Sequence, residues 1–412
     1  MRRFVPFPVL ACMAAALLTA IAMAVQAPST AERFESAEKL FADHNYKEAG
    51  EAYRDVLRSP DAQPARVVQA MTQLEQCRNQ LGEVHFVDSD LRTAVEIHGR
   101  AYQVLDTAAE ILLRSIPYGT VADQEFSRGH GRGYAGRGGA GGMGISVGEQ
   151  DRLRALKWRH RALELASQVD STIEPAEMAK LHLRFAETLL HNRDTRQAWR
   201  LQALTDLTAQ PDYLDFDSAG YGPARYAPVD ASGMPVFYDL PESLGTAASD
   251  GARFRWALAQ AERAPQVAPQ ASLQWAQFLS GQFSVETLQA EQWIFRGDNN
   301  DAEEIQTKRL SLHTLEESET LARLANGIQR FELPDDFNAI RIYQKLSAPN
   351  VDDPGVAEEA LSKLVQIFLN RRQYPKAAEL LRASISRFDK NPEMRQQLLN
   401  SIVEPRLAFD PV

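Results

Sequence analysis

Apolar residues recur at helical spacing along most of the chain, most regularly within residues 319–388. In the second half of this stretch they follow an i, i+3/i+4, i+7 pattern on both sides of a turn at residues 372–374. Two amphipathic helices joined by a short turn are predicted here, because each half has one face to bury. The apolar positions are Leu361, Leu364, Val365, Phe368, Ala377, Leu380, Leu381, Ile385 and Phe388.

The segment before it repeats this plan, with a predicted helix over residues 321–328, a turn at residues 333–336 and a second helix from Ala339. Ala339 and Ala377 occupy equivalent positions 38 residues apart. This offset is close to the tetratricopeptide period of about 34 residues, in which small residues let two helices approach and neighbouring hairpins stack. The chain is therefore predicted to be all-α, an α-solenoid of tetratricopeptide-like helical hairpins.

Four further stretches show helical periodicity. Residues 31–57 form the most regular single repeat, and residues 180–207 form another predicted hairpin. Residues 65–82 and 88–115 are predicted to be amphipathic helices with weaker repeat character. The helical pattern thus extends through the N-terminal, central and C-terminal parts of the chain.

Two segments interrupt the helices. Residues 128–148 contain ten glycines in 21 positions, and because ordering such a sequence costs backbone entropy, a mobile Gly-rich surface loop is predicted. Residues 211–249 are rich in Pro, Gly and Asp but also in aromatic residues, which favours an irregular, ordered insertion packed on the helices. The predicted helical repeats are therefore N-terminal (residues 25–127), central (residues 149–210) and C-terminal (residues 250–412).

The insertion supplies a candidate interaction surface made of Tyr213, Tyr221, Tyr226, Phe237 and Tyr238. Aromatic side chains dominate the energetics of many protein interfaces. Stacked helical hairpins likewise present extended binding surfaces. Protein partners are expected on this basis, and the oligomeric state is left open.

The N-terminus has the plan of a secretory signal. Arg2 and Arg3 precede an uncharged run over residues 4–27, and Ala22-Met23-Ala24 is the predicted cleavage site. Residues 1–24 are therefore the predicted signal peptide, and the protein is expected to be periplasmic or extracellular, with no membrane span after cleavage. An uncleaved N-terminal anchor is the alternative, since a spanning helix needs roughly 20 residues.

Charge and cysteine content narrow the functional classes. Cleavage removes two arginines from a chain of formal net charge −10, which leaves −12 and argues against a protein built to neutralise the phosphates of nucleic acid. Only Cys77 remains after cleavage, so no intramolecular disulfide is possible and stability must come from packing. Cys77 shares a helical face with Leu74 and Leu81 and is predicted to be a core residue.

Motifs that could carry chemistry lack the structural context that they need. Residues 144–148 (GISVG) match the GxSxG elbow of serine hydrolases, in which a buried strand feeds a strained turn, but a glycine-rich stretch is not expected to form that strand. Residues 131–136 match GxGxxG and follow no predicted strand. Three aspartates between residues 212 and 217 lack the glycine and terminal glutamate of a calcium loop. No catalytic, cofactor-binding or metal-binding residue is therefore expected.

Several short strings, spread over most of the mature chain, go beyond generic repeats. Together they resemble the N-terminal helical region of large exported bacterial alpha-2-macroglobulin-like proteins. The strings are AWRLQ (198–202), LTDL (204–207), APVD (227–230), GMPV (233–236), DG (250–251), RFRWAL (253–258), LHTL (312–315), FELPDDFN (331–338) and NRRQY (370–374).

In that family, the helical region precedes β-sandwich domains that entrap or inhibit proteases, often through a Cys-Glu-Gln thioester. This chain contains no Cys-x-Glu-Gln and no predicted run of strands. The resemblance therefore implies the front end of a protease-trapping system, truncated or separately encoded, or a stand-alone relative whose role is docking. The sequence predicts a non-enzymatic, exported scaffold that mediates protein–protein interaction. The alternatives are a secreted serine hydrolase using Ser146 and a structural cell-envelope protein.

Overall fold

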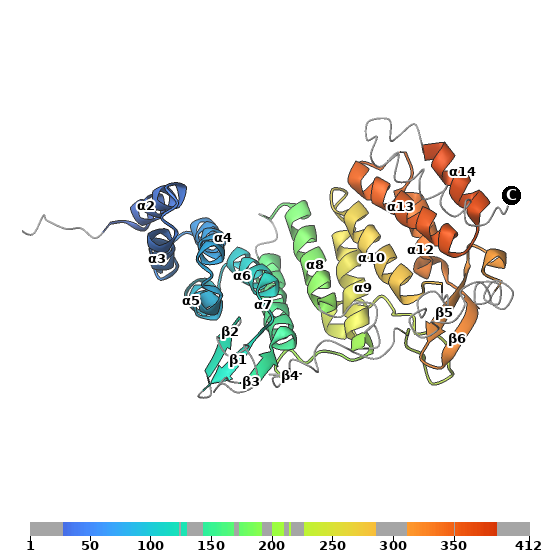
Figure 1. Ribbon diagram of the computed structural model, residues 1–412, viewed down its shortest axis with the longest axis horizontal. Helices are drawn as coiled ribbons and strands as arrows, with labels where there is room; N and C mark the ends of the chain where they lie inside the picture. The colour runs from blue at the N-terminus through green and yellow to red at the C-terminus, as the bar shows by residue number, and fades with distance from the viewer. Residues whose placement is uncertain are drawn as a thin grey trace, which may run out of the picture. The chain divides into compact units, whose positions relative to one another are not determined.

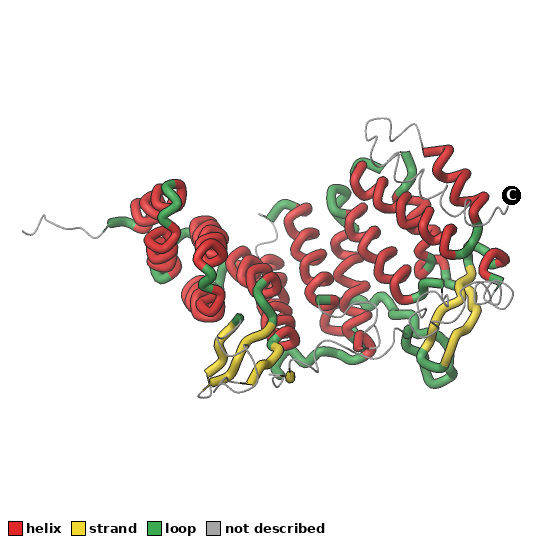
Figure 2. Tube along the Cα trace, in the orientation of Figure 1, coloured by secondary structure: helices red, strands yellow, loops and turns green. Residues whose placement is uncertain are grey.

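The computed structural model of the 412-residue chain describes residues 28–122, 125–129, 143–168, 173–191, 200–209, 214–215, 226–285, 311–349 and 351–384. These residues are mostly helical, with strands in two small sheets (Figure 2). The chain divides into two compact units, the first ending at Ser115 and the second beginning at Ile116, and each is described by itself. The predicted signal peptide lies outside the described residues. Within those ranges, no helix has the length and apolar character needed to cross a membrane.

Helices that contact one another in succession make up the first unit (Figure 1). Ser29 starts its first helix with a capping box to Glu32. The small side chains of Ala37 and Ala49 are fully buried, so the first two helices approach closely, as predicted for residues 31–57. The elements are α2 (Thr30–Ala42), α3 (Tyr46–Leu57), α4 (Pro64–Leu81), η1 (Val84–Phe86), α5 (Val87–His98) and α6 (Tyr102–Arg114).

Cys77 lies in α4 and is buried, as predicted for a core residue. Burial raises the pKa of the Cys77 thiol to about 11, so the thiol stays protonated at neutral pH. Next to it in the sequence, Arg78 donates to the Asp90 carboxylate at 2.9 Å, and Arg54 donates to the same carboxylate at 3.1 Å. These bonds tie α3, α4 and α5 together through one carboxylate that accepts from two guanidinium groups.

The second unit holds further helices and both sheets (Figure 1). Contacts join α7 to α8, α8 to α9, α10 to α12, α12 to α13 and α13 to α14. The helices are α7 (Gly148–Gln168), α8 (Pro175–Leu190), α9 (Asp250–Ala261), α10 (Ala268–Gln282), α12 (Ala339–Leu346), α13 (Pro354–Asn370) and α14 (Tyr374–Ser384). The strands are β1 (Tyr118–Ala122), β2 (Glu125–Arg128), β3 (Met143–Ser146), β4 (Leu214–Asp215), β5 (Glu319–Leu324) and β6 (Gly327–Glu332). The 3₁₀ turns include η5 (Leu244–Thr246), η7 (Leu312–Thr314) and η8 (Asp335–Phe337).

Strands β1, β2, β3 and β4 form an antiparallel sheet of order β2-β1-β3-β4. β2 ends at the first residue of the predicted Gly-rich loop, and β3 lies near its last residue. The two ends of residues 128–148 are ordered strands, which corrects the prediction there, while residues 130–142 lie outside the described residues. The buried guanidinium of Arg128 donates to both carboxylate oxygens of Asp151 at 2.7 and 3.0 Å. This bidentate pair fastens β2 to α7.

Residues 319–332 form an antiparallel hairpin of β5 and β6, where a helix was predicted. Six residue pairs are in register, ending with Leu324 opposite Gly327. The apolar spacing of this stretch fits a helix, but Asn326-Gly327 is a strong hairpin signal. Gly327 adopts a φ of +127°, which side-chain-bearing residues rarely adopt. The turn-forming residues Asn326 and Gly327 therefore determined the local structure, in spite of the helical spacing of the apolar residues.

Residues 200–209 form a short 3₁₀ turn at residues 200–202 and then irregular backbone, where the second helix of the central hairpin was predicted. Asp250, fully buried at the start of α9, accepts hydrogen bonds from the Thr205 amide at 2.9 Å and from the Thr205 hydroxyl. Arg253 donates to the Thr205 carbonyl at 2.9 Å. These distant side chains satisfy backbone groups that a helix would have satisfied internally.

A half-buried histidine lies between α8 and α9. The ring of His182 in α8 meets Trp256 of α9 edge-on, with centroids 5.2 Å apart, and its buried Nδ1 has no hydrogen-bond partner among the described residues. Burial, and then the nearby charge of Arg263, lower the pKa of His182 to about 4. The imidazole therefore stays neutral in the folded protein over a pH range in which an exposed histidine becomes charged.

We expect the free energy of unfolding to fall as the pH drops from 6.5 to about 4, because only the unfolded chain binds a proton at His182 in this window. A pKa difference of this size corresponds to about 3 kcal/mol. His182→Phe should remove this part of the pH dependence, whereas the exposed His313→Phe should retain it. Urea unfolding of each variant at about pH 7 and about pH 4.5 measures the difference. An unchanged pH dependence in His182→Phe would refute the assignment.

Candidate functional site

The five candidate interaction residues do not form one exposed surface within the described part of the chain. Tyr213 and Tyr221 lie outside the described residues. Tyr226 and Phe237 are half-buried, and Tyr238 is only 4% exposed. Tyr238 is therefore a core residue, which corrects its prediction as part of a binding surface.

Phe237 belongs to an aromatic cluster that joins the insertion to α10 and η8. Its ring centroid lies 4.8 Å from that of Phe337 and 5.5 Å from that of Phe283. The ring centroid of Trp275 in α10 lies 5.6 Å from that of Phe337, and Trp275 Nε1 donates to the Asp336 carbonyl at 2.9 Å. The described part of the insertion is thus ordered and packed on the helices, as its aromatic content predicted.

Tyr238 packs against Gly251 at the start of α9. A Cβ at Gly251 would lie 2.4 Å from ring carbons of Tyr238, so only glycine permits this approach. Arg255 of α9 donates to the Tyr238 carbonyl at 2.6 Å. Burial raises the pKa of the Tyr238 phenol, which stays protonated at neutral pH. Backbone and side chain together fix the insertion to α9.

Ser146 lies at the end of β3, and α7 begins at Gly148, which is the strand–turn–helix order of a nucleophile elbow. Of residues 138–143, which were not expected to form the strand before such an elbow, only Met143 is described, and it is the first residue of β3. Within the described residues, the Ser146 hydroxyl donates to the Pro117 carbonyl at 3.4 Å and accepts from the Gly148 amide at 3.5 Å. Both partners are backbone groups, and neither can take the proton of a nucleophilic serine.

The described residues include no cluster of three or more His, Cys, Asp and Glu side chains that could hold a metal ion. Of the three aspartates weighed for calcium, Asp212 and Asp217 lie outside the described residues. Asp215 is placed only by its backbone, in β4 opposite Ile145 of β3. The polar groups that do converge lie elsewhere, around the end of α13.

Arg371, directly after α13, holds the segment that leads into β5. Its side chain is 3% exposed and donates to the carbonyl oxygens of Glu316 at 2.9 Å and Glu319 at 2.7 Å. Burial lowers the pKa of Arg371 to about 10, while the Glu317 and Glu319 carboxylates favour the charged form. The guanidinium is therefore charged at neutral pH. In the part of the chain that the structure describes, its Nε has no hydrogen-bond partner.

Two neighbouring amides fasten the same segment. Gln373 donates from Nε2 to the Leu315 carbonyl at 2.7 Å, and Asn338 donates from Nδ2 to the Glu317 carbonyl at 2.9 Å. These side chains lie after α13 and before α12, so both helices hold residues 315–319. The β5–β6 hairpin is thus attached to the helices through backbone carbonyls.

The carboxylates nearest Arg371 have cationic partners of their own. Lys376 lies 3.1 Å from the Glu317 carboxylate, and Arg330 of β6 pairs with Glu319 across the hairpin at 2.5 Å. Hydrogen bonds from Gln344 and then Lys376 lower the pKa of Glu317 against the effect of burial, and hydrogen bonds from Arg330 lower the pKa of Glu319. Among the described residues, the Arg371 guanidinium therefore has only carbonyl oxygens as hydrogen-bond acceptors.

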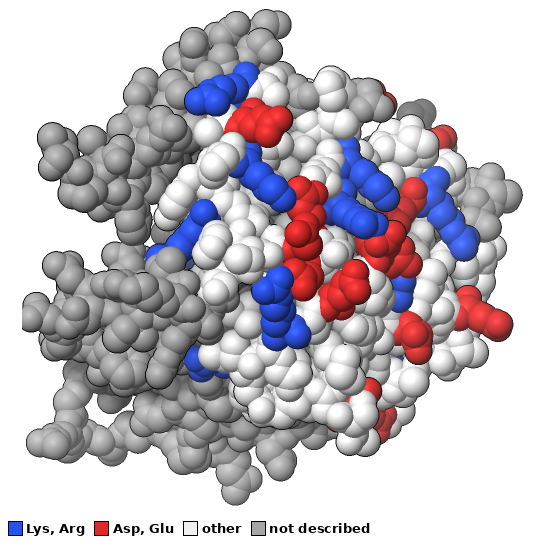
Figure 3. All heavy atoms as spheres, turned by 90° about the vertical axis from the view of Figure 1, so that its right-hand side faces the viewer, with Lys and Arg blue, Asp and Glu red and all other residues white. Residues whose placement is uncertain are grey.

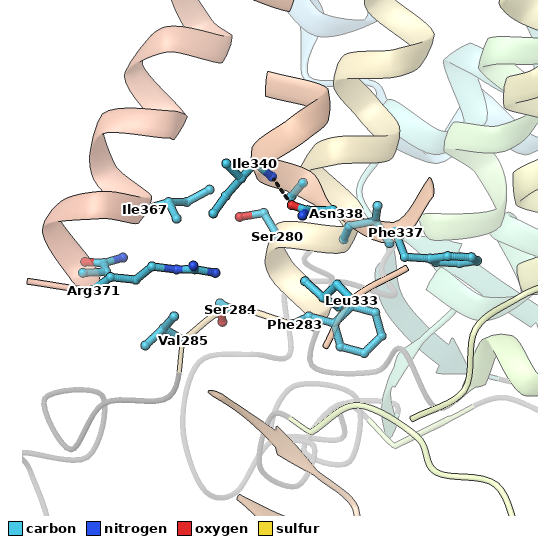
Figure 4. A pocket seen from close by; sticks show the side chains of 13 residues that line it. Ser280, Phe283, Ser284, Val285, Leu333, Phe337, Asn338, Ile340, Ile367 and Arg371 are labelled. Carbon is cyan, nitrogen blue, oxygen red and sulfur yellow. Dashed lines mark hydrogen bonds between the residues drawn. The ribbon is translucent and has the colours of Figure 1, made fainter. Parts of the chain in front are cut away.

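A pocket opens beside Arg371, between the C-terminal ends of α10 and α13 and the start of α12 (Figure 4). Its walls are largely apolar and include Phe283, Ile340 and Ile367. Ser280 of α10 is one of its polar groups, and the Arg371 side chain extends into it from the end of α13. We call this feature the Arg371 pocket.

The outer edge of β6 is a second candidate site. β5 pairs with β6 along one edge and with Ala227 at its other edge. Ile328 of β6 is 43% exposed. Beside the hairpin turn, Asn326 donates to the Gly233 carbonyl at 2.9 Å and the neighbouring Met234 is 53% exposed. Two large apolar side chains are thus exposed around this hairpin.

Charges of both signs are interspersed on the face shown in Figure 3. Blue Lys and Arg side chains alternate there with red Asp and Glu side chains over its described part. The ion pairs Arg330–Glu319, Arg341–Asp335 and Lys376–Glu317 come from this end of the second unit. A partner that docks on this face would meet both signs of charge.

Sequence reasoning missed both Arg371 and the edge of β6. Arg371 lies in the NRRQY string, where a turn between helices was predicted, and a charged residue in a turn ordinarily points into solvent. No sequence signal separates it from the adjacent Arg372. The hairpin did have a signal, because Asn326-Gly327 interrupts the apolar pattern.

Gly251→Ala should lower the free energy of unfolding by about 1–3 kcal/mol, because the new methyl group would displace the Tyr238 ring. Gly355→Ala in α13 is the matched control. Its Cβ would meet Asp353 Oδ1 at 3.4 Å, and the change should be neutral or stabilising by up to about 1 kcal/mol. Urea unfolding compares the two variants. A Gly251→Ala variant as stable as the wild type would contradict the packing of Tyr238 on α9.

No protein-family model matches the chain, and comparison with curated proteins gives no match. Among solved structures, the chain is similar to one described as "Assembly Chaperone of RpL4 (Acl4) (Residues 1-338)". The two are 14% identical, with a TM-score of 0.32 over 92% of this chain and 97% of that chain. At this score, no conclusion about function follows from the likeness.

Proposed function

We propose that this protein is an exported helical-repeat scaffold that binds another protein through the outer edge of β6 and catalyses no reaction. The observation that carries the proposal is the orientation of the β6 backbone. Leu333 donates to the Ser318 carbonyl at 2.7 Å, next to the first pair of the β5–β6 ladder. Because hydrogen-bonded pairs alternate in an antiparallel ladder, Ile328, Arg330 and Glu332 turn their backbone groups away from β5.

An extended segment of a partner can add to such an edge as a further strand, through main-chain hydrogen bonds. β6 contains no proline, which would have blunted the edge. The exposed Ile328 and Met234 favour a partner segment with an apolar side chain at the hairpin turn. The charges of Arg330 and Glu332 disfavour indiscriminate pairing and so favour a specific partner.

The finer parts of this proposal have separate support. The packed pairs α2–α3 and α13–α14, with buried Ala49 and Ala377 in their second helices, support tetratricopeptide-like hairpins that continue as a solenoid. The charged and then apolar N-terminus supports export. The similar strings support a role as the front end of an alpha-2-macroglobulin-like protease-trapping system. Two of them, residues 331–338 and 370–374, contribute Asn338, Arg371 and Gln373 to the attachment of the hairpin.

The proposal is tested by photo-crosslinking in the host, with p-benzoylphenylalanine at position 328. We expect an adduct with an exported protein, because this position lies on the pairing edge. The same group at position 240 is the matched control, since Leu240 is an exposed apolar residue outside the hairpin. Arg330→Pro should reduce the adduct at position 328 by about tenfold, because proline removes an outward-facing N–H. It spares the backbone hydrogen bonds to β5 but removes the Arg330–Glu319 ion pair, so Arg330→Ala, which removes the ion pair and keeps the N–H, is the matched control. Equal adducts at both positions, or no effect of Arg330→Pro, would contradict the proposal.

A further inference from the structure

Arg371 presents a buried donor that the described part of the protein does not use. Its guanidinium uses Nη1 and Nη2 to bind the carbonyls of Glu316 and Glu319, and Nε has no partner among the described residues. Leaving a buried donor of a charged group unmet is unfavourable. The side chain is 3% exposed and lines the pocket, which places the unmet donor beside space that a ligand can enter (Figure 4).

The electrostatic surroundings of this pocket favour an anion. The pocket lies at the start of α12, whose N-terminal amides carry the positive end of the helix dipole. The Ile340 amide already donates to the Asn338 side chain at 3.0 Å. The helix would therefore attract an anion through its dipole and not through a hydrogen bond from this amide. Glu317 and Glu319 are engaged by Lys376 and Arg330. They are therefore not free to neutralise Arg371 by direct contact.

Size and wall chemistry narrow the class of anion. The space open to the centres of water-sized groups is about 50 Å³. At roughly 10–15 Å³ for one such group, it holds about four of them, which matches a carboxylate and one or two carbon atoms. Phe283, Ile340 and Ile367 supply apolar walls for the carbon atoms. A larger ligand would insert its carboxylate end and leave the rest outside.

We propose that the Arg371 pocket binds a carboxylate carried on an aliphatic carbon, with Nε of Arg371 as a donor. Two sources offer this chemistry: a free short-chain carboxylic acid and the C-terminal carboxylate of a polypeptide. The site is separate from the outer edge of β6 and does not depend on strand pairing there.

Saturation-transfer difference NMR on the full chain tests the proposal with four probes. These are butyrate, butyramide, and acetyl-alanyl-valine with either a free or an amidated C-terminus, all at equal ionic strength set with chloride. We expect the two acids to bind saturably and the two amides to bind with an affinity at least about tenfold lower. Tighter binding of the peptide acid would identify a polypeptide C-terminus as the source, and tighter binding of butyrate a free acid. Amides that bind as well as acids, or inorganic phosphate that displaces butyrate at lower concentration than acetate does, would overturn the proposal.

Variants locate the site without relying on Arg371 alone. Arg371→Lys keeps the charge, removes Nε and should weaken butyrate binding. Ile367→Phe fills the pocket from a half-buried position and leaves the guanidinium in place, so it should abolish binding while the protein remains folded. Val351→Phe is the matched control, because Val351 lines a separate hollow whose described lining residues include no arginine. Butyrate binding that survives Ile367→Phe would contradict the assignment.

Discussion

A guanidinium group that donates to main-chain carbonyls recurs where irregular segments meet helices in the second unit. An irregular segment cannot satisfy its own carbonyl groups in the way that a helix does. Arginine offers several donors in a rigid planar fork, and a hydrogen bond from a charged donor contributes about 1.5–3 kcal/mol. The non-helical parts therefore depend on a few buried or half-buried arginines. These bonds join Arg128 to Ile116, Arg253 to Thr205, Arg255 to Tyr238, and Arg371 to Glu316 and Glu319.

The range of these contacts explains what the sequence could predict. Pairs such as α2–α3 and α13–α14 follow from a local apolar period, since each helix buries one face against its neighbour. The pattern failed at residues 200–209 and at the β5–β6 hairpin. There the deciding partners are remote: Thr205 and Asp250 are 45 residues apart, and Glu316 and Arg371 are 55 apart. A single sequence does not show such pairings.

For the candidate sites too, the sequence predicted what depends on local composition and missed what depends on remote contacts. Aromatic composition predicted that the insertion would be ordered, and for its described residues 226–249 Phe237 bears this out by packing on Phe283 and Phe337. Composition could not tell which aromatic side chains face inward, so buried Tyr238 was assigned to a surface. Both candidate binding features, the Arg371 pocket and the outer edge of β6, arise where irregular segments attach to helices. The helices supply the frame, and the attached segments supply groups that a partner can reach.

The central claim is that the β5–β6 hairpin is integral to the helical frame because the buried side chains of Asn338, Arg371 and Gln373, at the ends of α12, α13 and α14, hold its entry segment. Native-state hydrogen exchange of the full chain, followed by mass spectrometry, tests this claim most directly. The account predicts that amides of β5, such as those of Ala322 and Leu324, open with the same free energy as that of Leu364 in the core of α13. Exchange of the β5 amides orders of magnitude faster than that of the Leu364 amide would contradict it.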